Sequence, residues 1–330
     1  MRKTLMTTAA LALMALMPAA EAATLKLSHV RPQDTTVDKE LRVFAQQVEA
    51  ATGGEISIRL FPASALGDFT SVQERISVGA IDMAVQPAAT GADRRIQIST
   101  FPYIADDWDA ARRLYGAGGI IREKVSGLLA EQDITVLAVY PVYFSGIALN
   151  TEAVAPGDPS VAKGIKVRVP GVKSFQLSGE ALGYIPAPIP FSEAFTAVQT
   201  GVVDGVIGSG AEGYYASFRD VTKTYIPANL HFEIWYLMVS NSTLAELSED
   251  DVAALRAAAE TFETTRWGVA EKDQALNEAK LAESGATIVD LNEEQLSAMA
   301  AKIRTEVWPE ILRDIGEDWG RAILDEVAAQ

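Results

Sequence analysis

The chain contains no cysteine and only two histidines, His29 and His231. The lack of thiols excludes a lipid-attached cysteine, a disulfide framework, thiol catalysis and cysteine-ligated zinc. Two histidines also leave little material for a histidine metal cluster. We therefore expect no metal and no cofactor.

Long apolar runs are missing after the N-terminus. The apolar stretch at residues 5–17 follows Arg2 and Lys3 and precedes Ala20-Glu21-Ala22, which fits the small-x-small rule for signal cleavage. About 13 apolar residues are too few for a membrane helix, which needs ~20. The sequence therefore predicts a signal peptide at residues 1–22, export to the periplasm and no direct membrane insertion.

Positive charge is scarce, with 28 lysines and arginines against 44 acidic residues and a formal net charge of −16. Loss of Arg2, Lys3 and Glu21 with the signal peptide would make the remaining chain one unit more negative. Such a charge repels nucleic acid and anionic lipid, so neither is an expected partner. An anionic ligand would need a buried cation acting at short range.

Recognisable catalytic motifs are also missing. The chain has no G-x-S-x-G elbow, and Gly208-Ser209-Gly210 lacks the lysine and spacing of a P-loop. One enzyme class stays open as an alternative, a secreted carboxylate-pair hydrolase of the glycosidase type, because acidic residues are plentiful. No particular carboxylate pair is marked by the sequence.

The hydrophobic pattern alternates between strands and helices. This β-α-β-α-β order predicts an α/β protein with a mostly parallel sheet. The length after cleavage suits two domains, and the absence of a Pro/Gly-rich linker indicates a chain that crosses between them more than once. The predicted strands are 24–28, 56–60, 81–85, 134–139, 147–149, 166–169, 202–207 and 234–239, and the predicted helices are 35–51, 71–78, 174–182 and 192–200 with Ser192 as N-cap.

The segment from Glu249 to Ser284 reads almost entirely as helix, with Val252, Leu255, Ala259 and Phe262 on its inner face. At 1.5 Å per residue it would extend roughly 50 Å, more than the width of one small domain. We therefore expect a strut across both domains. Two further helices, 293–307 and 311–327, are predicted with a break at Pro309.

Arg168 is the first candidate for ligand binding. It lies on the alternating stretch Ile165–Val169, directly before Pro170. Its planar guanidinium can donate two parallel hydrogen bonds to a carboxylate and does not lose its proton. Spacing alone leaves open an ordinary solvent-exposed arginine on a strand.

One segment resembles the ligand-grasping half of the DctP-type solute-binding proteins of tripartite ATP-independent periplasmic (TRAP) transporters. It is Lys163–Gly205, with the sequence KGIKVRVPGVKSFQLSGEALGYIPAPIPFSEAFTAVQTGVVDG. Weaker matches lie at residues 60–68, 79–83 and 101–103. The resemblance implies a two-domain periplasmic binding protein, a clamshell with crossing strands and a long domain-spanning helix. It implies domain I at 23–143 and 234–272, and domain II at 144–233 and 273–330.

The resemblance also implies a function without catalysis. Such a protein captures a small organic acid in the cleft between its domains and docks transiently on the TRAP membrane subunits, which use an ion gradient for uptake. Arg168 would hold the ligand carboxylate. Phe191 would face the ligand or the core, and the other residues expected to border the cleft are His29, Gln86, Tyr143 and Trp235.

This chain departs from the common family pattern at two places. Gly208 stands where many members carry an amide side chain against the ligand, and Ser209 beside it is also expected to border the ligand. Ser145 stands where members that bind sialic acid carry a second arginine. Both departures argue against sialic acid and leave the identity of the organic acid open.

Overall fold

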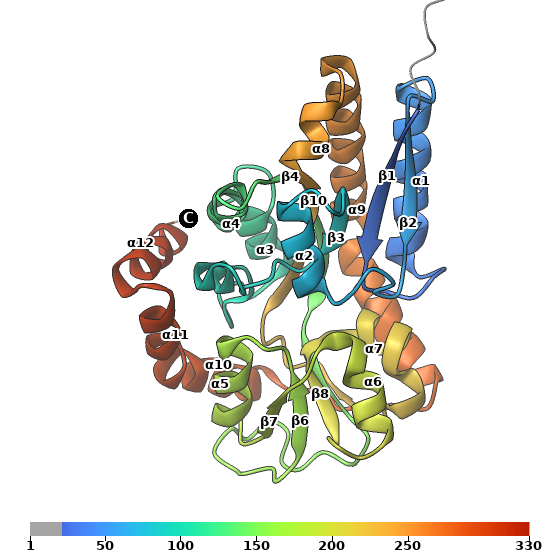
Figure 1. The fold of residues 1–330 in the computed structure, drawn as a ribbon. Coiled ribbons are helices and arrows are strands. Elements are labelled where there is room, and N and C mark those ends of the chain that lie inside the picture. Colours follow the sequence, from blue (N-terminus) through green and yellow to red (C-terminus); the bar gives the residue numbers. More distant parts are fainter. Residues whose placement is uncertain (1–21, 330) are drawn as a thin grey trace, which may run out of the picture.

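The computed structural model describes residues 22–329 and contains two β-sheets, each flanked by helices (Figure 1). The predicted signal peptide falls, apart from Ala22, outside the described residues. We call the first sheet with its helices the first lobe, and the second sheet with its helices the second lobe. Figure 1 shows the first lobe above the second.

The first sheet has the strand order β2-β1-β3-β10-β4. β1 runs parallel to β2 and β3, whereas β10 is antiparallel to both β3 and β4. Leu25 and Leu27 of β1 are buried and alternate with exposed Lys26, as the sequence pattern indicates. The strands are β1 (Ala23–His29), β2 (Ile56–Phe61), β3 (Met83–Gln86), β4 (Ile134–Phe144) and β10 (Phe232–Ser240).

The second sheet has the order β11-β9-β5-β8-β6-β7. β6 is parallel to β7 and β8, while β5 is antiparallel to β8 and β9. Its strands are β5 (Gly146–Leu149), β6 (Lys166–Val169), β7 (Ile185–Pro188), β8 (Gly205–Ser209), β9 (Thr224–Ile226) and β11 (Thr287–Ile288).

Helices cover the sheets. On the first lobe they are α1 (Thr36–Ala51), α2 (Phe69–Ser77), the 3₁₀-helix η1 (Arg94–Thr100), α3 (Trp108–Tyr115), α4 (Ile120–Ala130) and α8 (Asn241–Glu246). On the second lobe they are α5 (Lys173–Ala181), α6 (Phe191–Gln199), α7 (Ala211–Phe218) and the 3₁₀-helix η2 (Arg219–Val221).

The chain passes between the lobes at three places before its C-terminal helices, and a fourth time between α10 and α11. β4 continues into β5 with only Ser145 between them, and the chain returns from β9 to β10. The two passages are hydrogen-bonded, since Ser145 N donates to His231 O at 2.9 Å and Leu230 N donates to Ser145 O at 3.1 Å. The third passage is α9 (Glu249–Glu283), whose 35 residues extend about 50 Å along both lobes (Figure 1).

The predicted strut is therefore confirmed: α9 packs on α1 and β4 in the first lobe and on α7 in the second. Its first turn carries Glu249, Asp250 and Asp251, and Ser248 caps it by accepting a hydrogen bond from Asp251 N. Within residues 22–329, none of the helices combines the length and the apolar character that crossing a bilayer requires.

The C-terminal helices differ from the prediction of two helices broken at Pro309. They are α10 (Glu293–Glu306), α11 (Trp308–Ile315) and α12 (Glu317–Ala328). Pro309 begins α11 instead of only ending α10, because a helix does not use the N–H groups of its first turn. A second break falls at Gly316, whose φ of 95° no regular helix accommodates.

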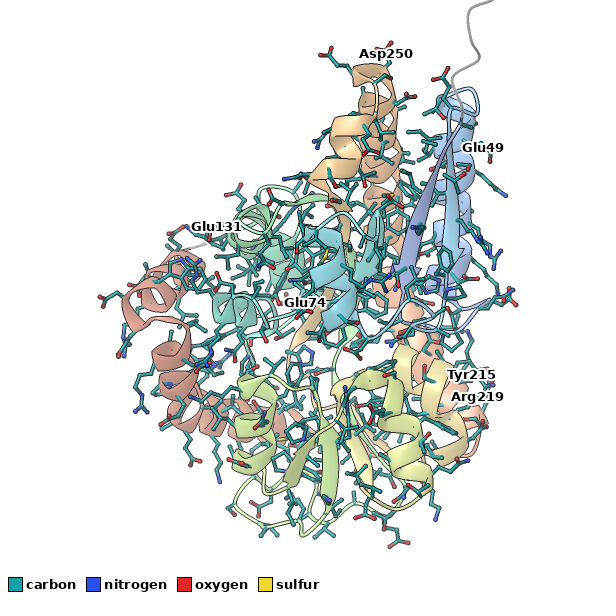
Figure 2. The ribbon with its side chains drawn as sticks, in the orientation of Figure 1. Glu49, Glu74, Glu131, Tyr215, Arg219 and Asp250 are labelled. Atoms are coloured by element: carbon teal, nitrogen blue, oxygen red, sulfur yellow. The ribbon has the colours of Figure 1, made fainter. Side chains whose placement is uncertain are left out.

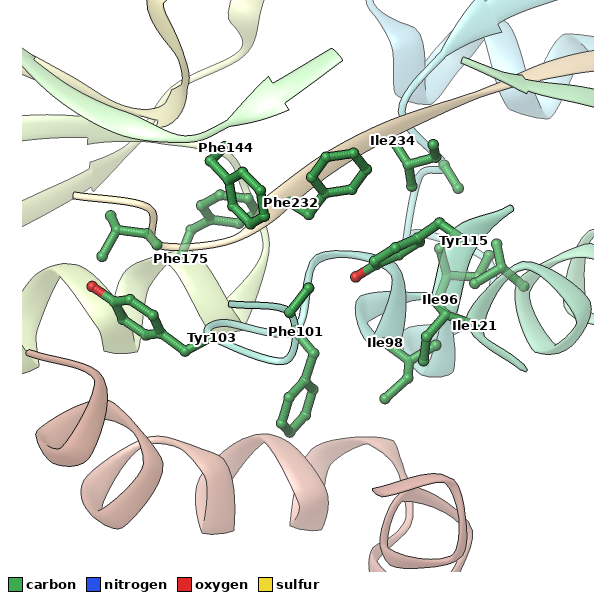
Figure 3. Close-up of a cluster of buried hydrophobic side chains, with 14 of the residues drawn as sticks. Ile96, Ile98, Phe101, Tyr103, Tyr115, Ile121, Phe144, Phe175, Phe232 and Ile234 are labelled. Carbon is green, nitrogen blue, oxygen red and sulfur yellow. The ribbon is translucent and has the colours of Figure 1, made fainter. Parts of the chain in front are cut away.

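α10 packs on α5 of the second lobe, and α11 and α12 pack on η1 and α4 of the first. One apolar cluster follows this contact across both lobes (Figure 3). Within it the ring centroids of Phe101 and Trp308 lie 5.2 Å apart, and those of Phe144 and Phe232 lie 5.1 Å apart. The lobes are thus joined by apolar packing on this side of the molecule.

Charged side chains occupy the outside of both lobes (Figure 2). Glu49, Glu74, Glu131 and Asp250 are all exposed, which places much of the negative charge in water. This arrangement is typical of charges that keep a protein dissolved and do not specify its fold.

The β-α-β-α-β prediction for residues 24–85 is confirmed, with boundaries shifted by two residues or fewer. β7 was not predicted because its sequence, Ile-Pro-Ala-Pro, lacks two ladder donors. It lies at the edge of the sheet, the place where prolines are tolerated. The N-cap prediction for Ser192 is wrong, since α6 begins at Phe191 with Pro190 as N-cap.

Candidate functional site

A cavity of about 60 Å³ lies between the lobes. The carboxyl ends of parallel strands from both sheets meet around it: Val30 and Arg31 follow β1, Pro170 follows β6, and Ser209 ends β8. Open α/β sheets bind ligands at such strand ends, because loops and helix starts converge there. The crossing strands β4 and β10 complete the wall.

Six of the predicted site residues line this cavity: Tyr143, Arg168, Phe191, Gly208, Ser209 and Trp235. They come from both lobes and include residues of both crossing strands. Up to 92 positions of chain separate members of this set. The fold therefore brings together residues that the sequence could place only one by one.

Arg168 is a buried cation without an acidic partner. It is 2 % exposed, and its Nε donates to the carbonyl oxygen of Ile189 at 2.7 Å. Within the described part of the chain its terminal nitrogens meet no carboxylate within 4.0 Å. Burial lowers the pKa of Arg168 to about 10, so the side chain is still charged at neutral pH. A buried charge of this kind is costly unless a counter-ion joins it.

Arg31 is the second arginine at the cavity, and it has a partner. Its guanidinium meets Glu212 of α7 with an Nη2–Oε2 distance of 2.8 Å and an Nε–Oε2 distance of 2.9 Å. Burial alone would lower the pKa of Arg31, but Glu212 beside it raises that pKa overall. Because Arg31 belongs to the first lobe and Glu212 to the second, this pair ties the lobes together.

The ring of Phe191 lies against both arginines. The guanidinium carbon of Arg31 is 5.3 Å from its centroid, and that of Arg168 is 5.7 Å away. Arg31 also lies over Trp235 at 4.8 Å. Phe191 packs on core clusters in both lobes as well, so it serves the core and the cavity together.

Two hydroxyl groups bridge the lobes at the cavity. Tyr143 of β4 and Ser209 of β8 lie 3.0 Å apart, oxygen to oxygen, and Arg31 Nη2 donates to the Tyr143 hydroxyl at 3.4 Å. Burial raises the pKa of Tyr143, and the nearby carboxylate of Glu233 acts in the same direction. The Tyr143 hydroxyl is therefore a neutral donor and acceptor at physiological pH.

Glu233 is the only acidic residue in the cavity wall. Its carboxylate accepts from Trp235 Nε1 at 2.7 Å and lies 2.9 Å from His231 Nε2. Ser145 Oγ lies 2.7 Å from His231 Nδ1 and accepts from His231 N at 3.2 Å. His231 thus lies between Glu233 and Ser145, within hydrogen-bond distance of both side chains. It connects the cavity to the crossing point of the chain.

Three predicted site residues lie outside the cavity wall. Ser145 is fully buried at the crossing point, as just described. His29 is fully buried in the first lobe, with Nε2 3.1 Å from an oxygen of Asp38. Gln86 donates from Nε2 to the carbonyl oxygen of Phe69 at 2.7 Å, and Phe69 itself lines the cavity. Their roles in the structure are to position neighbouring elements.

The run Gly208-x-Gly210-x-x-Gly213 joins β8 to α7 with the spacing of a dinucleotide-binding turn. Protein atoms occupy the space beside each glycine. A Cβ would lie 2.7 Å from Pro170 at Gly208, 2.5 Å from Tyr143 at Gly210 and 2.5 Å from Arg31 at Gly213. The glycines thus allow the walls of the cavity to approach, and they leave no room for a pyrophosphate.

Sequence reasoning missed Arg31 and Glu233. Arg31 follows directly after His29 and Val30, but nothing in its local pattern indicates contact with a glutamate 181 positions away. Glu233 lies on β10, a strand that is buried along its whole length. A single acidic residue in such an apolar strand was the one feature of the sequence that could have marked it as a functional residue. Within residues 22–329, no three His, Asp or Glu side chains are placed to hold a metal ion.

Comparison with known proteins gives a family match over most of the chain. The family described as Bacterial extracellular solute-binding protein, family 7, matches residues 27–314. A solute-binding protein from Roseobacter denitrificans is 28% identical over 88% of this chain and 90% of its own. A C4-dicarboxylate-binding periplasmic protein, DctP, from Rhodobacter capsulatus is 27% identical over 94% of this chain and 90% of its own.

Solved structures agree with this match. A TRAP periplasmic solute-binding protein from R. denitrificans, solved with bound L-galactonate, superimposes with a TM-score of 0.79 at 25% identity, over 91% of this chain and 99% of that one. A TRAP periplasmic solute-binding protein from Sulfurospirillum deleyianum, solved with bound succinate, has a TM-score of 0.84 at 23% identity and shares the fold, over 94% and 99% of the two chains. The two-lobed α/β chain described above therefore belongs to bacterial extracellular solute-binding protein family 7, the DctP-type solute-binding proteins of TRAP transporters.

Proposed function

We propose that this protein captures a small organic acid in the cavity between its lobes, in the periplasm, and delivers it to the membrane subunits of a TRAP transporter. Members of the family bind solutes for transporters and are not enzymes, so the hydrolase alternative is not favoured. The relatives solved with L-galactonate and succinate hold carboxylates, which supports an organic acid as the ligand here.

The observation that carries the proposal is the unpaired, buried charge of Arg168. Its Nε is used by Ile189, which fixes the guanidinium plane at the cavity wall. Its terminal nitrogens have no carboxylate within 4.0 Å among the described residues, although Glu233 stands elsewhere in the cavity wall. A ligand carboxylate there would satisfy both the charge and the hydrogen bonds in a single planar contact.

The test is isothermal titration calorimetry of the mature chain with a panel of small aliphatic and aromatic carboxylates. Arg168→Ala should weaken the binding of the best ligand by about 2–5 kcal/mol, or roughly 30- to several-thousand-fold, because a buried carboxylate loses its partner. Arg168→Lys should also weaken binding, because it keeps the charge and loses the two-pronged geometry.

Arg321→Ala is a matched control, since Arg321 is an exposed arginine that pairs only with Glu317 within α12. It should bind like the wild type. If Arg168→Ala binds within about threefold of wild type, the carboxylate anchor is another residue. If the ligand is converted to a product, the protein is an enzyme and the proposal of a pure binder is wrong.

Closure of the lobes is part of the proposal. We assign residues 23–143 and 234–272 to one moving domain, and residues 144–233 and 273–330 to the other, with the hinge at the hydrogen-bonded pair of Ser145 and His231. In this assignment α11 and α12 belong to the second domain and rest on η1 and α4 of the first. The cavity walls come from both lobes, and several of the side chains that line it are buried, so movement of the lobes would widen the entry for a ligand. Rotation about a few residues at element ends is the common way for such clamps to do so.

A further inference from the structure

The charges that line the cavity indicate which organic acid it accepts. Three charged residues line it: Arg31, Arg168 and Glu233. The charge of Arg31 is already balanced by Glu212, at 2.8 Å. Arg168 is therefore the one cation in the cavity wall that lacks an acidic partner within the described residues. A ligand with a single carboxylate would complete the balance, whereas a second carboxylate would have no cation to meet.

Glu233 makes a second carboxylate unfavourable. The side chain is 4 % exposed and is held by Trp235 and His231, so it cannot turn away into water. Two like charges in a desolvated cavity repel strongly, since little solvent lies between them. A carboxylate with two accepted hydrogen bonds still has free lone pairs, so Glu233 can accept another bond from a ligand hydroxyl.

The remaining wall is mostly apolar and the space is small. Val30, Phe69, Ala88, Pro170, Val172 and Phe175 all face the cavity. At about 10–15 Å³ for each water-sized position, 60 Å³ holds roughly four to six such positions. The hydroxyls of Tyr143 and Ser209 are already bonded to each other, which leaves Thr90 and Thr100 as the other hydroxyl-bearing residues of the wall. A sugar acid with a hydroxyl on every carbon would leave several of them without partners.

We propose, on the basis of the function proposed above, that the ligand is a short hydroxy-monocarboxylate with an apolar body, and that Glu233 excludes dicarboxylates. In this arrangement Arg168 holds the carboxylate of the ligand. Glu233 accepts a hydrogen bond from the ligand hydroxyl, and the apolar side chains surround the hydrocarbon part. Glu233 thereby determines specificity while Arg168 supplies the anchor.

The experiment measures calorimetric affinities for two matched pairs of acids. In each pair a carboxylate replaces the methyl group of the monocarboxylate: 2-hydroxybutyrate is compared with malate, and butyrate with succinate. Galactonate is included as the acid with many hydroxyls. At about pH 7.5 all the carboxyl groups are ionised. We expect each monocarboxylate to bind at least about tenfold more tightly than its dicarboxylate partner, and 2-hydroxybutyrate to bind more tightly than galactonate.

Glu233→Gln keeps the size of the side chain and removes its charge. It should reduce the preference for the monocarboxylate over the dicarboxylate by about tenfold or more. If wild type binds malate or succinate as tightly as the matched monocarboxylates, or galactonate more tightly than 2-hydroxybutyrate, the inference is overturned while the proposed function stands. An unchanged preference in a folded Glu233→Gln variant also overturns it. If no carboxylate binds at all, the proposed function itself fails.

Discussion

Gly208 controls how closely β8 approaches Pro170 in the cavity wall. Its φ of 103° lies in the left-handed half of backbone space, and a Cβ would lie 2.7 Å from Pro170 Cδ. Gly208→Ala should therefore lower the free energy of unfolding by about 1–3 kcal/mol and should also weaken ligand binding. Urea denaturation followed by circular dichroism measures the first effect, and calorimetry measures the second.

Gly171→Ala provides the comparison, because Gly171 lies just after β6, the neighbour of β8, with no atom within 4 Å of its Cβ position and an unstrained φ. It should change the free energy of unfolding by less than about 0.5 kcal/mol. Equal stability losses in the two variants would contradict the explanation from backbone strain and the contact with Pro170.

At the level of single residues, the sequence pointed to residues that have a recognisable neighbourhood. Arg168 stands between a Val-rich strand and a proline, and the structure places it in the wall of the cavity. Arg31 and Glu233 were missed because their importance depends on partners that are distant along the chain. Ser145 and His29 were expected to border the ligand, but the structure buries both outside the cavity wall.

At the scale of single elements, β1 and α1 are joined by a buried pair of residues, His29 and Asp38. Burial lowers the pKa of His29 below its ordinary value of 6.5 despite the nearby carboxylate. The unfolded chain therefore takes up this proton first as the pH falls. The free energy of unfolding should decrease from about pH 6.5 downward, until the folded protein also takes up the proton.

His29→Gln removes the titrating group, so the decrease between about pH 7 and pH 5 should be smaller in this variant than in wild type. Denaturant titrations at both pH values measure the difference. Asp38 contributes to the pH dependence only at lower pH. Burial raises its pKa, but hydrogen bonds from the Asp34 N–H and from Arg42 lower that pKa more, so that overall it lies below 3.8. Parallel curves for wild type and His29→Gln would assign the acid sensitivity to other groups.

Elements with strong periodicity could be predicted, and elements stabilised by their surroundings could not. α9 was readable from the sequence because its apolar residues recur at helical spacing over 35 residues. β7 could not be recognised from the sequence, because two of its four residues are prolines and its place in the sheet depends on pairing with β6. The separate α11 and α12 result from Gly316, whose backbone conformation the sequence did not reveal.

At the scale of the whole molecule, the pair of Arg31 and Glu212 joins the two lobes, and we expect it to favour the closed arrangement. Its side chains are only 2 % and 7 % exposed, so each loses its water when the lobes meet. Glu212→Gln leaves Arg31 without a counter-charge in the closed form, at a cost of about 3–5 kcal/mol, whereas the open form can hydrate it. Without ligand, the variant should have a larger radius of gyration than wild type in small-angle scattering.

The same variant should bind its ligand more weakly, because part of the binding free energy is then used to close the lobes. Glu317→Gln is a suitable control, since it removes an exposed pair of α12 that is expected to contribute little. An unchanged radius of gyration together with unchanged affinity in Glu212→Gln would mean that this pair does not influence closure.

Trp235 gives the molecule an optical signal of its own. Its indole donates to Glu233, lies under the guanidinium of Arg31 and lines the cavity, whereas the other four tryptophans do not line it. An arriving ligand that bonds to Glu233 changes the electric field and the exposure of this one indole. Tryptophan emission should therefore follow ligand capture in real time, without any attached dye, and Trp235→Phe should abolish most of that change.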